Sequence, residues 1–74
     1  MRWNPERYDQ LEHAVRNGLR VILQRRGTEY VVIATRLGQG PRGEAFHGRL
    51  PMTGETMEFP LDEIDWFQVL REDG

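Results

Sequence analysis

An Asn17-Gly18 pair divides the chain between two hydrophobic periodicities, and this change limits the folds open to it. Before the pair, apolar residues recur at helical spacing: Tyr8, Leu11, Ala14 and Val15. After it, apolar and polar residues alternate in short runs, as they do in half-buried β-strands. The sequence therefore predicts one N-terminal helix followed by a mainly β domain.

Local signals place the ends of the helix. Asn4 is a favourable N-cap, and Pro5 loses no hydrogen bond at the first helical position. Gly18 can take the left-handed conformation that ends a helix. We expect a helix over about residues 5–17, too short to be stable unless it docks on the rest of the domain. Trp3, just before the cap, is expected to pack on the helix as a hydrophobic staple.

Five short strands are predicted after the helix, over residues 19–24, 29–37, 44–50, 55–60 and 64–70. The apolar run 29–37 is expected to be central and partly covered on both faces. Gly38–Gly43 should be a loop, Gly48 a bend or bulge, and residues 60–63 a single helical turn. The 74 residues form one domain, and we expect residues 19–70 to close into a five-stranded SH3-like or Sm-like small barrel, since closure removes exposed strand edges.

The composition excludes several kinds of chemistry. The chain has no cysteine, serine or lysine, so thiol and serine nucleophiles, Cys-ligated zinc and lysine Schiff bases are ruled out. All ten basic residues are arginine, which we attribute to a GC-rich genome rather than to phosphate or carboxylate recognition. No apolar run approaches the ~20 residues of a membrane span, and no signal peptide is evident. We expect a cytoplasmic protein with no membrane partner.

Two motifs resemble cofactor or metal sites. The segment GQGPRG, Gly38–Gly43, fits the G-x-G-x-x-G pattern, but a dinucleotide site needs a helix after it. The residues that follow are interrupted by Gly48 and Pro51, so no cofactor is predicted. His13 and His47 lack the paired spacing of metal ligands, and no metal site is predicted.

The segment FPLDEIDWFQVL places three carboxylates, Asp62, Glu63 and Asp65, within an apolar run. Catalytic carboxylates must face each other, with one of them desolvated. We expect Asp62 to cap the short turn, Glu63 to reach water, and Asp65 to point away from Trp66, which would share a face with Ile64. No catalytic residue and no enzymatic activity are predicted.

Charge is distributed unevenly along the chain. Residues 18–50 carry six arginines against two glutamates, whereas residues 51–74 carry one arginine against seven acids. The two segments either form a dipolar surface that steers a charged partner, or lie side by side and neutralise each other. Tyr30 and Phe46 lie among the arginines, a pattern typical of RNA binding, although core packing explains these aromatic residues better.

The segments YDQLEHAVRNGLRVILQRRGTEYVVIA and FPLDEIDWF resemble the Rho-binding antiterminator (Rof) family, with its Y-D-x-L-E-x-A start and its L-D-x-I near the end. The resemblance implies a helix on an Sm-like barrel that binds the transcription terminator Rho and obstructs its RNA-binding surface. It would place Tyr8, Asp9 and Glu12 on the partner-facing surface. That family is acidic, whereas the middle of this chain is basic.

The chain is also similar to the barrel of WYL-domain regulators. The W-Y-L signature itself is replaced by EAFHGRL, and Glu63 stands where ligand-sensing members have arginine.

We therefore predict a non-catalytic binding module that regulates transcription or RNA metabolism through a Rho-like protein partner. An RNA-binding Sm-like protein, a subunit of a homo-oligomeric ring and a metal-dependent enzyme built on His13, His47 and the acidic end are the alternatives. The candidate partner-binding residues are Tyr8, Asp9, Glu12, Arg16, Arg20, Arg25, Arg26 and Arg42.

Overall fold

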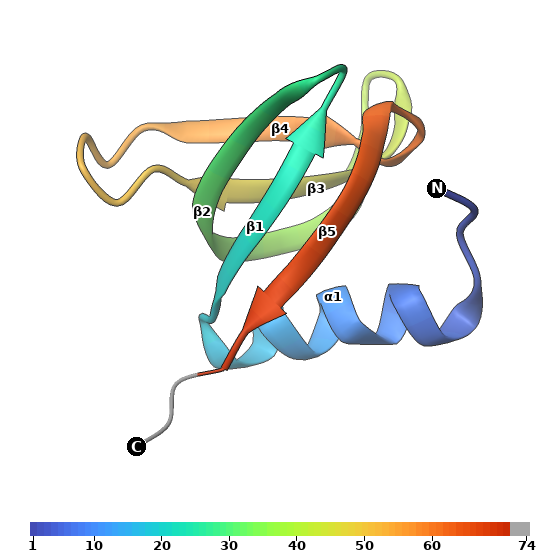
Figure 1. Ribbon diagram of the computed structural model, residues 1–74, viewed down its shortest axis with the longest axis horizontal. Helices are drawn as coiled ribbons and strands as arrows, with labels where there is room; N and C mark the ends of the chain where they lie inside the picture. Colours follow the sequence, from blue (N-terminus) through green and yellow to red (C-terminus); the bar gives the residue numbers. More distant parts are fainter. Residues whose placement is uncertain (72–74) are drawn as a thin grey trace.

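The computed structural model describes residues 1–71, in which one helix precedes five strands (Figure 1). The elements are α1 (Pro5–Asn17), β1 (Arg20–Arg25), β2 (Thr28–Gly40), β3 (Gly43–Arg49), β4 (Thr56–Pro60), the 3-10 turn η1 (Leu61–Glu63) and β5 (Ile64–Leu70). The prediction of a mainly β fold with one N-terminal helix is confirmed. The predicted single turn between the last two strands is also confirmed.

Both ends of α1 form as the local signals predict. The Asn4 side chain accepts a hydrogen bond from the Arg7 amide at 2.8 Å. Gly18 adopts φ 61° and ψ 37°, and the Leu19 amide donates to the Ala14 carbonyl at 2.9 Å. This left-handed cap turns the chain directly into β1.

Trp3 contacts β5, whereas the sequence predicted a staple onto its own helix. Its indole stacks on Phe67, with ring centroids 5.5 Å apart, and its Nε1 donates to the Leu61 carbonyl at 2.8 Å. The segment before α1 is therefore tied to η1 and β5, which fixes the position of the helix relative to the last strand.

The five strands form one antiparallel sheet in the order β4-β3-β2-β1-β5. Within residues 1–71 the edge strands β4 and β5 do not pair with each other, so strand pairing does not close the barrel expected from the sequence. Pro60, the last residue of β4, has no amide to donate, and η1 separates the two strands. The sheet curves so that β3 and β4 pass behind β1 and β5 in Figure 1.

Two irregularities in strand register change which side chains face the core. One lies between Ala34 and Arg36 of β2, where Thr35 is the extra residue. The Thr35 hydroxyl donates a hydrogen bond to the His47 carbonyl at 3.0 Å. The irregularity that the sequence predicted near Gly48 of β3 therefore lies in β2, the strand that pairs with Gly48.

The second irregularity makes Asp65 an extra residue at the start of β5. Ile64 is buried, and Phe67 lies opposite the buried Leu23, so both face the core. Trp66 faces outward and is 37% exposed. The predicted shared face of Ile64 and Trp66 is wrong, because strict alternation does not hold across a bulge.

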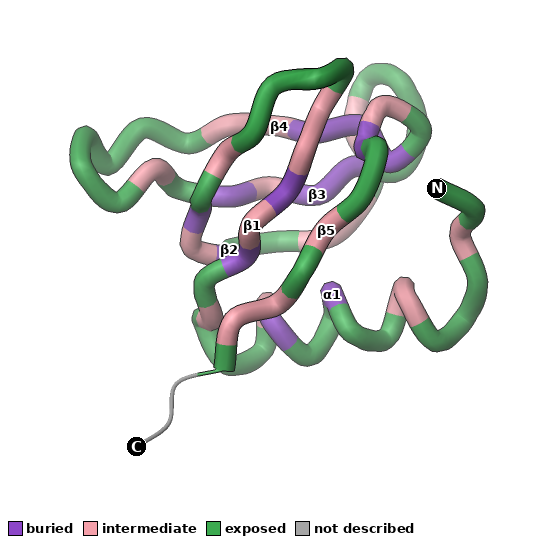
Figure 2. The backbone as a smooth tube through the Cα atoms, in the orientation of Figure 1, coloured by how far each residue is buried: buried purple, intermediate pink, exposed green. Residues whose placement is uncertain are grey.

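The core lies between α1 and the concave face of the sheet (Figure 2). Buried residues alternate in β1 and in the middle of β2, whereas β3 and β4 each contain two adjacent buried residues. It consists of Leu11, Ala14, Val21, Leu23, Val32, Ala34, Phe46, Phe59, Leu61 and Ile64. Tyr30 packs edge-on against Phe59, which confirms a packing role for the aromatic residues of the basic segment. On the outer face of β2, Val31 is 41% exposed and Ile33 is half-buried.

The expected Gly38–Gly43 loop is largely strand. β2 continues to Gly40, β3 begins at Gly43, and Pro41-Arg42 alone form the turn between them. A Cβ on Gly40 would lie 2.0 Å from a carboxylate oxygen of Glu58, so glycine leaves room for that side chain. The motif belongs to a β-hairpin, and the helix required by a dinucleotide site does not follow it.

Candidate functional site

Glu63 is enclosed by three arginines, contrary to the prediction that its side chain reaches water. Arg25 Nε lies 2.8 Å from one carboxylate oxygen, and Arg42 Nη1 lies 3.0 Å from the other. Arg26 Nη2 is 3.6 Å away, and the Glu63 side chain is 8% exposed. Hydrogen bonding to Arg25 is the main cause that lowers the pKa of Glu63, against a smaller opposing effect of burial. Glu63 is thus held as a carboxylate where the ends of two hairpins meet.

The other two acids of this segment have separate environments. Asp65 accepts a hydrogen bond from the Gly27 amide at 2.9 Å, which joins β5 to the turn between β1 and β2. Asp62 is exposed and does not cap η1, because Pro60 occupies the capping position and provides no side-chain hydrogen bond. The predicted capping role of Asp62 is wrong.

These contacts bring the basic middle of the chain against its acidic end. The arginines of the two hairpin turns pair with Glu63, and β1 and β3 pair with β5 and β4. The side chains of Arg26 and Arg42 nevertheless remain 72% and 70% exposed. Part of the positive charge is therefore neutralised internally, and part still faces solvent.

Tyr8 anchors α1 to the start of β3. Its hydroxyl donates a hydrogen bond to the Glu44 carboxylate. This bond, together with burial and the charges of Glu44 and Glu12, raises the pKa of Tyr8 to about 12. Tyr8 is therefore engaged within the molecule, whereas Asp9 and Glu12 are exposed beside it.

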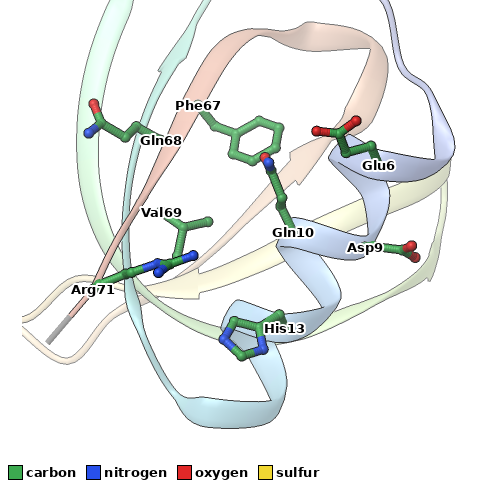
Figure 3. Close-up of a pocket in the computed structure, with 8 residues that line it drawn as sticks. All are labelled: Glu6, Asp9, Gln10, His13, Phe67, Gln68, Val69 and Arg71. Carbon is green, nitrogen blue, oxygen red and sulfur yellow. The ribbon is translucent and has the colours of Figure 1, made fainter.

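A groove of about 760 Å³ lies between α1 and β5 (Figure 3). Its lining residues are Glu6, Asp9, Gln10 and His13 of α1, Phe67, Gln68 and Val69 of β5, and Arg71 directly after β5. Gln10 extends toward the Phe67 ring, while the Asp9 carboxylate turns away from it. The sequence did not predict this groove, because its apolar floor depends on the bulge that turns Phe67 and Val69 inward.

The eight predicted partner-binding residues occupy four places. Asp9 borders the groove, and Tyr8 and Glu12 lie on the side of α1 near Glu44. Arg16 and Arg20 are exposed on either side of the cap that ends α1, and no ion pair within residues 1–71 involves them. The remaining three surround Glu63: Arg25, Arg26 and Arg42.

The two histidines lie on separate elements. His13 borders the groove, whereas His47 is half-buried in β3 with its Nε2 buried and unpaired. Across residues 1–71, no three histidine, aspartate or glutamate side chains gather in a way that would hold a metal ion. The single helix of this part of the chain is too short and too polar to cross a membrane.

Comparison of the chain with models of protein families, with curated proteins and with solved structures finds no match.

Proposed function

We propose that this chain is a non-catalytic binding module that regulates transcription or RNA metabolism by binding a Rho-like protein through the solvent face of α1. The observation that carries the proposal is an imbalance in charge pairing. The ion pairs of residues 1–71 all converge on Glu63, so the three acids of α1, Glu6, Asp9 and Glu12, have no cationic partner there. The two arginines of α1, Arg7 and Arg16, are likewise without ion pairs in this part of the chain, which leaves the helix with an excess of one negative charge. An exposed helix on which carboxylates outnumber arginines suits a partner whose own binding surface is basic.

The basic middle of the chain is compatible with such a partner. Three of its six arginines are directed toward Glu63, on the hairpin turns. The order of the elements, one helix and then a sheet of order β4-β3-β2-β1-β5, supports the proposal of an Sm-like small barrel. The sheet is open between β4 and β5. A protein acting on the transcription machinery of a bacterial cell would work in the cytoplasm.

The proposal is tested by measuring the binding of purified Rho to the immobilised chain. Reversing two acids of the helix face, in the variant Asp9→Arg/Glu12→Arg, should weaken binding at least about tenfold, because charge reversal replaces attraction with repulsion. The matched control is Glu55→Arg/Asp62→Arg, which reverses two exposed acids outside α1 and changes the net charge equally.

Equal loss of binding in both double variants would show a dependence on net charge alone and would contradict the helix-face assignment. Absence of binding by the unmodified chain would reject Rho as the partner. Affinity capture from lysate with and without RNase would then show whether the partners are proteins or RNA.

Binding of single-stranded RNA is the second candidate, and the arginines around Glu63 favour it. Three guanidinium groups surround one carboxylate, and two of them are largely exposed. If RNA binds there, Arg26→Gln/Arg42→Gln should weaken binding of a labelled oligonucleotide and reduce its salt dependence. Unchanged RNA affinity in this variant would exclude the arginine cluster as the binding surface.

A further inference from the structure

We propose that the groove between α1 and β5 binds an extended basic segment of the partner, which pairs with the edge of β5 as a sixth strand. The inference deepens the proposed function, because it takes the partner to be a protein. It names the part of that protein that is bound: a stretch of alternating apolar and cationic residues in β conformation.

The first support is the position of the groove relative to β5. Within residues 1–71, β5 pairs with β1 on one side alone, so its other edge presents backbone groups without strand partners. The groove is lined by Phe67 and Val69, which face inward, and also by Gln68, which faces outward. A hollow that touches both faces of a strand lies along its edge, where an added strand would bind.

The second support is the apolar floor. Phe67 and Val69 are half-buried and two residues apart, which matches the spacing of alternate side chains in an extended peptide. Phe67 is held by the stacked indole of Trp3 and does not need to rearrange. A volume of about 760 Å³ accommodates several side chains of a bound segment.

The third support is the polar rim. Glu6 and Asp9 border the helix side of the groove, with the Asp9 carboxylate turned away from Phe67, and Arg71 borders the strand side. The two carboxylates outnumber the single arginine, which favours lysine or arginine in the bound segment. The side chains of Gln10 and Gln68 make no hydrogen bond within residues 1–71 and are available to a peptide backbone. An acidic segment would be attracted by Arg71 and repelled by both carboxylates.

The test uses the full ¹⁵N-labelled chain and a blocked heptapeptide of alternating lysine and valine. We expect saturable chemical-shift changes at the amides of residues 6–13 and 67–70, and slower amide exchange along β5. Methylating alternate backbone nitrogens, so that one edge of the peptide cannot donate hydrogen bonds, should weaken binding at least about tenfold. A glutamate-valine heptapeptide should bind at least about tenfold more weakly.

One variant and one matched control locate the site. Glu6→Lys should weaken binding of the lysine-valine peptide about fivefold, whereas Glu55→Lys, an equal charge change outside the groove, should leave it unchanged. The dispersion of the amide spectrum verifies that both variants fold. Absence of binding at millimolar peptide, equal affinity for the N-methylated or acidic peptide, or shifts outside the groove would each overturn the inference.

Failure of this inference can be told apart from failure of the proposed function. If Rho binds through Asp9 and Glu12 but the peptides do not bind, the partner docks on the helix face alone. If the lysine-valine peptide binds as described but Rho does not, the groove is a peptide site for another partner, and the proposed function fails.

Discussion

At the scale of single residues, Glu63 shows how a carboxylate in an apolar run can serve the fold. Its position after one helical turn places it among arginines from two hairpins. The sequence marks Glu63 as charged and as part of a connector. It does not show that the turns containing Arg25 and Arg42 end at the same point in space.

Glu63→Gln should therefore destabilise the protein in a pH-dependent way. The folded state lowers the pKa of Glu63 from 4.5, so its stabilising effect is complete above pH 4.5 and is lost as the pH falls through the lower folded value. Urea unfolding at pH 7 and at several pH values below 4.5 should show a difference between wild type and variant that shrinks with acidity. A difference independent of pH would contradict an ionic role, and Asp62→Asn provides the control for losing an exposed carboxylate.

Two glycines should respond to alanine for different reasons. A Cβ on Gly48 would lie 2.4 Å from Val32 Cγ2 in the core, so Gly48→Ala should cost about 1–3 kcal/mol through overpacking. Gly18 has open space but a φ of 61°, so Gly18→Ala should cost about 1 kcal/mol through backbone strain. Chemical denaturation measures both. Gly18→Asn should be more stable than Gly18→Ala, because asparagine tolerates a positive φ. Gly48→Asn should be no more stable than Gly48→Ala, and a gain of stability there would contradict the steric account.

At the scale of elements, sequence reasoning succeeds where the signals are local. The helix ends follow from Asn4 and Gly18, and β5 begins and ends where its apolar run does. Reasoning from the sequence fails at the extra residue Asp65, because a bulge depends on the pairing with β1 and not on β5 alone. The groove was missed for the same reason, since its floor includes Phe67, which strict alternation from Ile64 places outward.

The contact between α1 and β3 predicts a change of stability at alkaline pH. The pKa of Tyr8 is raised to about 12, so its stabilising effect is present below pH 10, the ordinary value, and is lost as the pH rises through about 12. Ultraviolet titration of tyrosinate should show this late ionisation, and Tyr8→Phe should remove it. Glu44→Gln should move it toward pH 10, because the carboxylate is its main cause; an unchanged titration would contradict the assigned hydrogen bond.

At the scale of the whole molecule, the two edge strands of the sheet differ from its central strands in how they are paired. β1, β2 and β3 each pair on both sides, whereas β4 and β5 pair on one side within residues 1–71. The sequence predicts short strands but does not determine whether the first and last strands of the sheet meet. That depends on the path of η1, where Pro60 and Leu61 turn the chain away from β4.

Amide hydrogen exchange distinguishes an open sheet from a closed barrel. In the open sheet, amides of the central strands should exchange at rates set by global unfolding, whereas alternate amides of β4 and β5 point away from their single partner strand. Those outward amides should exchange at least about a hundredfold faster than the amides of β1 and β2. Uniform protection of all five strands would mean that β4 and β5 are hydrogen-bonded to each other or to another chain. Dilution separates these cases, since protection by another chain falls with concentration and closure within one chain does not.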